Sequence, residues 1–461
     1  MKCAPHRLVW SRLAQTSGAS LAQCAAWIVV AIVFGSFIPR VYLLTTRPAG
    51  NDLMVYLESG RALARGENPY SYSIGGTPQN HGPYPLTIDT LIVPFTWVPL
   101  WLAEVLWFGL SLAALIGALS ILDRLWKRAG TNTSTAQEIP FVFRLATVAL
   151  VLFVPLQSHF GYGQLDLVIL LMCCLFVRAQ LRDRDGQAAL WLGGGIALKL
   201  TPSVLVVDLV ARRKVRTLLL TGVWILGWAI LVPTLVSADT VGFYRGWWLE
   251  GLRHHLESPV GIDWRTRFAL AGMLVRLWPG LAAVPGLYYW VAAAVLAPLT
   301  ALEGRAARDT RTHLMLFGVY LTTIPLLSPI SEMHHLTILL GALWVWLLAA
   351  GSHPSMLAFD GAAAALFVTF HWLGIAWNRT RPGLGHYFPT RTGSLFEGGA
   401  VLALYVILLI RILVASRPPG ETRARELLPQ SKRDAPGQPQ WRDGSLDTGT
   451  LAGGSASRAD P

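Results

Sequence analysis

Long apolar runs separated by short polar segments dominate the chain. Most of these runs approach the roughly 20 apolar residues that a helix needs to cross a bilayer. The pattern therefore predicts an all-α, polytopic membrane protein with a bundle of about 10–12 transmembrane helices. The expected spans are residues 21–39, 101–122, 140–157, 164–180, 215–236, 281–302, 313–327, 336–350, 355–376 and 395–416.

Two apolar stretches do not fit a single span. Residues 86–98 are too short to cross a bilayer and are broken by Pro94, which predicts an interfacial or half-inserted helix. Residues 187–210 are interrupted at Lys199-Leu200-Thr201-Pro202, and basic segments flank them on both sides. A hairpin of two short helices with Lys199 near its tip fits this pattern better than one span.

Basic residues set the expected orientation. Lys2 and Arg7 precede the first span, and the positive-inside rule keeps them in the cytoplasm. Counting the spans from a cytoplasmic N-terminus at 1–20 places both termini inside, with a membrane domain at 21–416. Residues 417–461 are rich in Pro, Gly, Ser and charge, which predicts a disordered cytoplasmic tail.

Composition narrows the function classes. Of 461 residues, 53% are hydrophobic and only 14% are charged, which excludes an ordinary soluble domain. In a membrane protein the charge of each loop indicates its side of the membrane, so the net charge of +12 does not indicate a nucleic-acid partner, and none is expected. The four cysteines, of which Cys173 and Cys174 are adjacent, form neither a disulfide framework nor a metal-ligand spacing.

The stretch Asn51–Tyr70 carries the first candidate for chemistry. Leu53 and Leu57 fall at helical spacing among polar residues, so we expect an amphipathic helix in the membrane interface with its apolar side in lipid. Asp52, at the start of this helix, would lie on the outer side, where the polar and apolar parts of an amphipathic substrate meet. A solvated loop carboxylate is the alternative interpretation of Asp52.

Other candidate residues also lie on the expected outer side or within the membrane. They are the Gly163-Gln164 turn, the loop around Arg253-His254-His255, and Glu332 with His334-His335. Adjacent histidines point to different faces of a helix and no metal-ligand spacing appears, so no metal is expected. Lys199 is a costly intramembrane charge, which suggests a function. Binding the open carbonyl groups at the end of a half-helix is an equally good explanation for Lys199.

Five sequence strings carry a resemblance to a known family. They are D-L-M-V-Y-L-E-S-G-R-A-L-A-R-G-E-N-P-Y from Asp52, P-Y-P-L at 83–86 before a Pro-broken apolar run, G-Y-G-Q-L-D-L-V-I-L-L at 161–171, G-G-G-I-A-L-K-L-T-P-S-V-L at 193–205, and S-P-I-S-E-M-H-H-L at 328–336. In this order they resemble glycosyltransferase family 87, membrane glycosyltransferases of the GT-C class, over about residues 27–350. The chain departs from the family pattern at Glu332, where an aromatic residue is common.

The resemblance implies an inverting membrane glycosyltransferase. It would move a sugar, mannose by expectation, from a polyprenyl-phosphate donor to a lipid or glycan acceptor on the outer face, among membrane lipids and without a cofactor. Asp52 would act as the general base on the acceptor hydroxyl, and outer-face cations would stabilise the leaving phosphate. The expected substrate-binding residues are Tyr70, Gln164, Lys199, Arg253, Arg265, Glu332, His334 and His335.

Two alternatives stay open. A pentosyl (arabinofuranosyl) transferase of the same class, with a decaprenyl-phosphate donor, fits the same residues. A lipid or sugar transporter would also explain the many spans and the intramembrane Lys199. Transporters often carry broken helices in corresponding positions of two repeated halves, however, and the sequence indicates one broken hairpin with no matching second.

Overall fold

The computed structural model describes residues 6–39, 52–74, 77–80, 84–129, 139–246, 269–284, 286–306, 309–328, 333–350, 357–379 and 391–415. The chain divides into two units, Met1–Ser416 and Arg417–Pro461. The second unit lies outside the described residues, and so does the predicted disordered tail.

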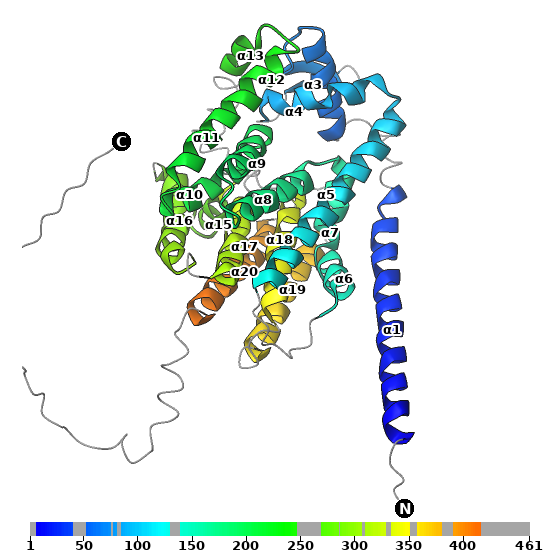
Figure 1. Ribbon diagram of the computed structural model, residues 1–461. Coiled ribbons are helices and arrows are strands. Elements are labelled where there is room, and N and C mark those ends of the chain that lie inside the picture. Colours follow the sequence, from blue (N-terminus) through cyan, green and yellow to red (C-terminus); the bar gives the residue numbers. More distant parts are fainter. Residues whose placement is uncertain are drawn as a thin grey trace, which may run out of the picture. The chain divides into compact units, whose positions relative to one another are not determined.

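Helices make up nearly all of the described elements, which confirms the all-α prediction (Figure 1). The bundle contains α1 (His6–Gly35), α5 (Leu100–Ala129), α6 (Phe141–Val151), α7 (Phe153–Tyr162), α8 (Asp166–Gln180), α9 (Asp185–Leu198), α10 (Val206–Ala211), α11 (Val215–Leu226), α12 (Val232–Thr234), α15 (Leu270–Leu277), α16 (Leu287–Ala306), α17 (Thr310–Leu327), α18 (Leu339–Ala350), α19 (Leu357–Arg379) and α20 (Arg391–Ala415). Short 3-10 or π turns extend or connect them: η2 (Thr201–Leu205), η3 (Gly227–Leu231), η6 (Pro279–Ala283) and η7 (Met333–Ile338).

Several helices have the length and apolar character of membrane spans. Among the described residues, Leu100–Ala129, Val215–Thr234 and Met333–Ala350 are each long and apolar enough to cross a membrane. The bent pair α6–α7 adds a fourth if it is counted as one span. Shorter apolar helices occupy other expected spans, among them Leu21–Gly35 and Gly398–Val414. The membrane class is therefore confirmed, and the number of about 10–12 spans stays a prediction.

The predicted span at 140–157 is not one continuous helix. Helices α6 and α7 meet at a bend of 76°, one residue after Val151. Pro155 lies in the first turn of α7, where a missing N–H group is tolerated. The same residue cannot donate a hydrogen bond to continue α6, and its ring would clash with the preceding turn. The bend turns α7 toward η7, with which it packs.

The predicted hairpin at 187–210 is present. Its two ends meet, because Lys214 Nζ lies 2.9 Å from Asp183 Oδ1 and Thr217 Oγ1 donates to Asp185 Oδ1 at 2.7 Å. Between them α9 ends at Lys199, whose backbone is extended, and η2 then turns back onto α9.

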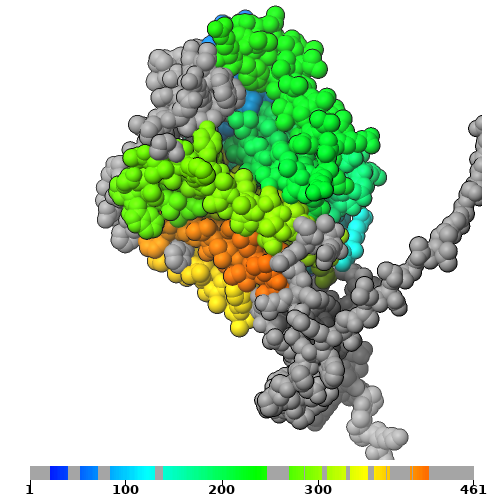
Figure 2. Space-filling model, turned by 90° about the vertical axis from the view of Figure 1, so that its left-hand side faces the viewer, coloured from blue at the N-terminus to red at the C-terminus, as the bar shows by residue number. Residues whose placement is uncertain are grey.

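A glycine run lets α9 and α11 pack closely. A Cβ atom at Gly193 would lie 2.7 Å from Trp224 Cβ and 2.9 Å from the Thr221 carbonyl oxygen. The span Val215–Thr234, which begins with α11, is otherwise largely exposed, and only 11% of its most apolar 18 residues are buried. Figure 2 shows green atoms of this region covering much of one face. Such a face suits contact with lipid.

A separate group of short elements precedes α5 in the chain. It contains α3 (Asp52–Ala64), the antiparallel hairpin of β1 (Ser71–Ile74) and β2 (Thr77–Asn80), α4 (Leu86–Ile92) and η1 (Val93–Trp97). Helix α13 (Thr240–Gly246) joins this group, since Tyr244 Oη accepts the backbone N–H of Leu86 at 3.1 Å.

The apolar side of α3 is buried in protein, so the predicted contact of this side with lipid is wrong. Leu53, Leu57 and Leu63 are at most 1% exposed. The reason is that α4 and η1 cover them. The approach is close, because a Cβ atom at Gly60 would lie 2.6 Å from Ile92 Cγ2.

Buried ion pairs connect helix ends that the predicted topology places on the cytoplasmic side of the membrane. Removal of charges from water is costly, so each of these arginines lies against a carboxylate. The pairs are Arg144 with Asp123, Arg411 with Asp360 (Nε to Oδ1, 2.8 Å), and Arg212 with Glu303 (Nε to Oε2, 2.8 Å).

Candidate active site

Asp52 begins α3, and the corner between α7 and α8 holds its side chain. The Gln164 side-chain amide donates a hydrogen bond to Asp52 Oδ2. Gln164 is completely buried, whereas Asp52 is partly exposed. Asp52 is therefore a fixed carboxylate at the edge of the fold, and the alternative of a solvated loop carboxylate does not fit this contact.

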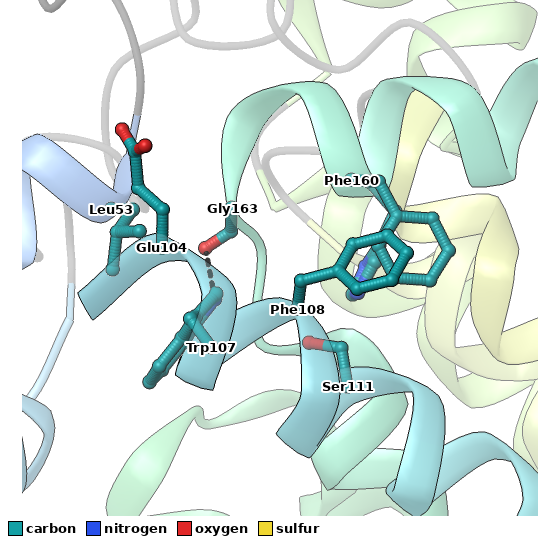
Figure 3. A pocket seen from close by; sticks show the side chains of 8 residues that line it. Leu53, Glu104, Trp107, Phe108, Ser111, Phe160 and Gly163 are labelled. Atoms are coloured by element: carbon teal, nitrogen blue, oxygen red, sulfur yellow. Dashed lines mark hydrogen bonds between the residues drawn. The ribbon is translucent and has the colours of Figure 1, made fainter. Parts of the chain in front are cut away.

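The corner has a backbone shape that needs glycine. Gly163 ends α7 with a positive φ of 67°, and a Cβ atom there would lie 2.5 Å from Leu53 Cβ. The Trp107 indole N–H donates to the Gly163 carbonyl oxygen at 2.8 Å, as the dashed line in Figure 3 shows. Helix α5 thus fixes the corner on one side, and α3 packs on the other.

A small cavity of about 10 Å³ lies beside this corner. Leu53, Glu104, Trp107, Ser111 and Gly163 are among the side chains and backbone that line it (Figure 3). Its volume is that of about one water molecule. It is therefore part of the packing around Asp52 and is too small for a sugar.

A buried ion pair lies next along the chain from the corner. Asp166 is the first residue of α8, and its Oδ1 lies 2.8 Å from Lys199 Nζ. The two side chains are 5% and 7% exposed. The ammonium group also lies 5.6 Å from the centre of the Tyr84 ring, a cation–π distance. The Lys199 side chain therefore binds a carboxylate and does not cap the open carbonyl groups of a half-helix.

His334 and His335 complete the cluster from η7. Both are buried, and their Nε2 atoms lie 3.2 Å apart. Because one nitrogen must donate and the other accept, at least one of the two Nε2 atoms carries a hydrogen. Ligand atoms of Asp166 and both histidines lie within 4.8 Å of one another. The histidine pair is thus adjacent to the Lys199–Asp166 pair.

Tyrosines connect the cluster with the elements before α5. The Tyr56 and Tyr84 rings contact edge to face with centroids 5.4 Å apart, and Tyr70 Oη donates to the Tyr84 carbonyl oxygen at 3.2 Å. Burial raises the pKa of Tyr56 well above its ordinary value, and Tyr84 and Asp52 add to this shift. Tyr56 therefore stays protonated and neutral beside the carboxylate at physiological pH.

The structure brings together most of the described candidates from the sequence. Gln164 contacts Asp52, and two residues further along the chain Asp166 pairs with Lys199. His334 and His335 adjoin Asp166, and Tyr70 is connected to Lys199 through Tyr84. The remaining candidates lie outside the described residues: Arg253, Arg265 and Glu332.

Sequence reasoning missed Asp166 and Tyr84. A signal for Asp166 was present, because an isolated carboxylate at the start of an apolar helix needs a partner and Lys199 is an isolated ammonium in another. Tyr84 belongs to the string P-Y-P-L, which carries part of the family resemblance, but nothing in that string indicated its contact with Lys199.

Two buried clusters of the described residues have the donor atoms for a metal ion. They are Asp166 with His334 and His335, and Asp208 with Glu303 and His313. Carboxylate oxygen and imidazole nitrogen suit divalent transition metals. In both clusters a basic side chain already contacts a carboxylate, Lys199 in the first and Arg212 in the second. A cation would therefore have to displace or oppose a positive charge.

The chain matches the sequence profile of glycosyltransferase family 87 over residues 83–329. This range is shorter than the expected 27–350. It includes Gln164, Asp166 and Lys199, and it excludes Asp52 and the histidine pair.

Mycobacterial mannosyltransferases are similar to this chain over most of their length. The polyprenol-phosphate-mannose-dependent alpha-(1-2)-phosphatidylinositol mannoside mannosyltransferase of Mycolicibacterium smegmatis is 29% identical over 378 residues, 76% of this chain and 80% of the relative. Its counterpart in Mycobacterium tuberculosis strain H37Rv is 28% identical over 360 residues, 72% of this chain and 76% of the relative. The polyprenol-phosphate-mannose-dependent alpha-(1-2)-phosphatidylinositol pentamannoside mannosyltransferase of M. tuberculosis strain CDC 1551 is 29% identical over 373 residues, 77% of this chain and 78% of the relative.

Proposed function

Because this chain belongs to glycosyltransferase family 87, we propose that it transfers mannose from polyprenyl-phosphate mannose to a mannosylated lipid or glycan acceptor. The similar mycobacterial enzymes use this donor and act on phosphatidylinositol mannosides, which supports both halves of the proposal. The observation that carries the mechanism is the carboxylate of Asp52, held by Gln164, two residues before the Asp166 that pairs with the buried Lys199.

Asp52 acts as the general base in this proposal. The acceptor hydroxyl attacks the anomeric carbon of the donor sugar and loses its proton to Asp52 as the new C–O bond forms. The bond from the anomeric carbon to the phosphate oxygen breaks, and its electron pair leaves with the polyprenyl phosphate. A single displacement of this kind inverts the anomeric configuration.

The leaving phosphate gains negative charge, which nearby donors stabilise in the transition state. Lys199 is the best placed of the described residues. Its ammonium has three N–H donors, of which Asp166 accepts one at 2.8 Å. His334 and His335 add imidazole donors beside it. We assign Tyr70 to the wall of the substrate site, and we keep Arg253, Arg265 and Glu332 as candidates from the sequence.

The topology follows from the loop charges. The active site faces the extracytoplasmic side, both termini are cytoplasmic, and the polyprenyl tail lies among the membrane helices. In this scheme residues 1–20 form the inner N-terminus, 21–416 the catalytic membrane domain, and 417–461 the tail.

Asp52→Asn tests the proposal. The amide keeps the size of the side chain and cannot accept a proton, so folding should survive while the rate falls about 100- to 10,000-fold. Glu58→Gln is the matched control, because Glu58 forms an ion pair with Arg61 in the same helix, and both side chains are partly exposed. The assay uses detergent-solubilised protein with polyprenyl-phosphate mannose and a phosphatidylinositol mannoside. An active Asp52→Asn enzyme with an inactive Asp89→Asn enzyme would move the base to Asp89.

The same assay separates the remaining alternatives. Product formed without a sealed vesicle is a transferase reaction and requires no transport across a membrane. A polyprenyl-phosphate pentose offered in place of polyprenyl-phosphate mannose should give no product. Faster transfer of the pentose would reverse the choice of donor.

A further inference from the structure

Gln164 contacts the proposed base with one end of its side chain and leaves the other end available. A carboxylate can only accept hydrogen bonds, so the amide nitrogen of Gln164 must face Asp52 Oδ2 and the amide oxygen must face elsewhere. That oxygen, Oε1, is buried and has no hydrogen-bond partner among the described residues. The whole side chain is 0% exposed.

An unpaired buried acceptor is costly, and native structures usually satisfy such groups. A ligand hydroxyl is the natural donor here, because the neighbouring Asp52 is itself the proposed acceptor of a substrate proton. A sugar ring offers hydroxyls on adjacent carbons. Two such donors suit the Asp52 carboxylate and the Gln164 amide oxygen, because that oxygen shares its carbon with the nitrogen that contacts Asp52.

The backbone holds Gln164 in one place. Its N–H group donates to the His159 carbonyl oxygen at 3.1 Å, and Gly163 before it accepts from the Trp107 indole at 2.8 Å. Helix α8 begins two residues later, at Asp166, so the residue after the turn is also fixed. Figure 3 shows the Gly163 end of this corner held against α5.

We propose, given the function assigned above, that Gln164 is the positioning residue for Asp52 and that its Oε1 accepts a hydroxyl of the acceptor sugar. The amide donor fixes the orientation of the Asp52 carboxylate toward the attacking hydroxyl. The amide oxygen binds the hydroxyl on the adjacent carbon. The acceptor therefore needs two neighbouring free hydroxyls, only one of which becomes glycosylated.

Two variants of Gln164 test the roles of its amide nitrogen and its amide oxygen separately. Gln164→Glu keeps an acceptor and loses the donor, and it places a second carboxylate beside the base. We expect kcat to fall about 10- to 100-fold, because misplacement of a reacting group by about 1 Å is that costly. The acid limb of the kcat/KM profile should move to higher pH, since neighbouring carboxylates oppose each other's ionisation. The KM for the acceptor should change little.

Gln164→Met removes both the amide donor and the amide acceptor. We expect a similar fall in kcat and, in addition, a rise of about 2- to 13-fold in the KM for the acceptor, the usual value of one neutral hydrogen bond. Gln180→Met is the control, because Gln180 is the last residue of α8, about 21 Å along the helix from Asp166, and its amide also has no partner among the described residues. It should behave as wild type. Size-exclusion profiles of all variants check their folding.

A double variant tests whether Gln164 acts through Asp52. In an Asp52→Asn background, Gln164→Met should reduce the residual kcat by less than about 3-fold, because residues that act as a unit are not additive. Full additivity would overturn the inference. The inference would also be overturned if the Gln164 variants kept the wild-type kcat, acceptor KM and acid limb of the pH profile while Asp52→Asn was inactive. The assignment of Asp52 as the base would then stand. A fully active Asp52→Asn enzyme would instead remove the proposed base and this inference together.

Discussion

The buried pair of Lys199 and Asp166 gives a direct test of how the candidate site is built. The charged atoms lie 2.8 Å apart, and the side chains are 7% and 5% exposed. At this distance, with an effective dielectric constant of about 20, two unit charges attract each other by about 6 kcal/mol. The loss of water around both ions offsets most of this attraction. The pair as a whole is therefore nearly neutral for stability, whereas either ion alone is costly.

Single and double substitutions separate these terms. Lys199→Met leaves a buried carboxylate unpaired, and Asp166→Asn leaves a buried ammonium unpaired. Each should lower the free energy of unfolding by about 3–5 kcal/mol. The double variant removes both charges and should recover most of this loss. Domains of 150–250 residues shift by about 2–4 °C per kcal/mol, so shifts of several degrees are expected.

The assay follows tryptophan fluorescence in one detergent at one heating rate, because unfolding of such a protein is irreversible and its Tm depends on the rate. Lys214→Met is the control, since Lys214 pairs with Asp183 at 2.9 Å but their side chains are 37% and 84% exposed. Exposed pairs contribute about 0–1 kcal/mol, so this variant should be nearly silent.

The rate of transfer gives the second readout. The double variant should regain the Tm of the wild type and stay slow, because the ammonium of Lys199 is proposed to bind the donor phosphate. Loss of one such contact costs about 1.5–3 kcal/mol, or about 10- to 150-fold in rate. An unchanged Tm in both single variants would refute the desolvated pair. A double variant with the wild-type rate would limit Lys199 to a structural role.

Three further predictions concern other parts of the chain. Gly163→Ala should lower activity at least about 10-fold and cost about 1–3 kcal/mol in stability, because φ is +67° and the new Cβ would lie 2.5 Å from Leu53 Cβ. Gly186→Ala is the control, because a Cβ there would meet nothing within 4 Å, and it should change neither activity nor Tm. Deletion of 420–461 should change neither rate nor Tm, since this segment has few large apolar side chains to offset an ordering cost of roughly 1–2 kcal/mol per residue; a large loss of either would indicate docking. Chelation with EDTA should leave the rate unchanged, because the ammonium of Lys199 lies where a metal cation would have to bind; loss of rate that Mn²⁺ restores would contradict this.

The sequence by itself determined which segments are helical and located the break at Lys199. A helix can satisfy its backbone groups internally, so each apolar run of sufficient length had one available structure in a membrane. The hairpin with Lys199 at its break was predictable for a related reason, because an intramembrane charge followed by Pro202 interrupts both the apolar pattern and the hydrogen bonding. The bend after Val151 was missed, although Pro155 marked it.

The surroundings of each helix depended on the tertiary structure. The apolar face of α3 was visible in the sequence, but lipid and a protein interior are equally apolar, so the pattern does not say which one covers it. In the folded protein, α4 and η1 cover this face. The composition of the site was decided in the same way. Gln164 binds Asp52 across 112 residues, and Lys199 binds Asp166 across 33, and such contacts between helices form only when the bundle brings the side chains within hydrogen-bond distance.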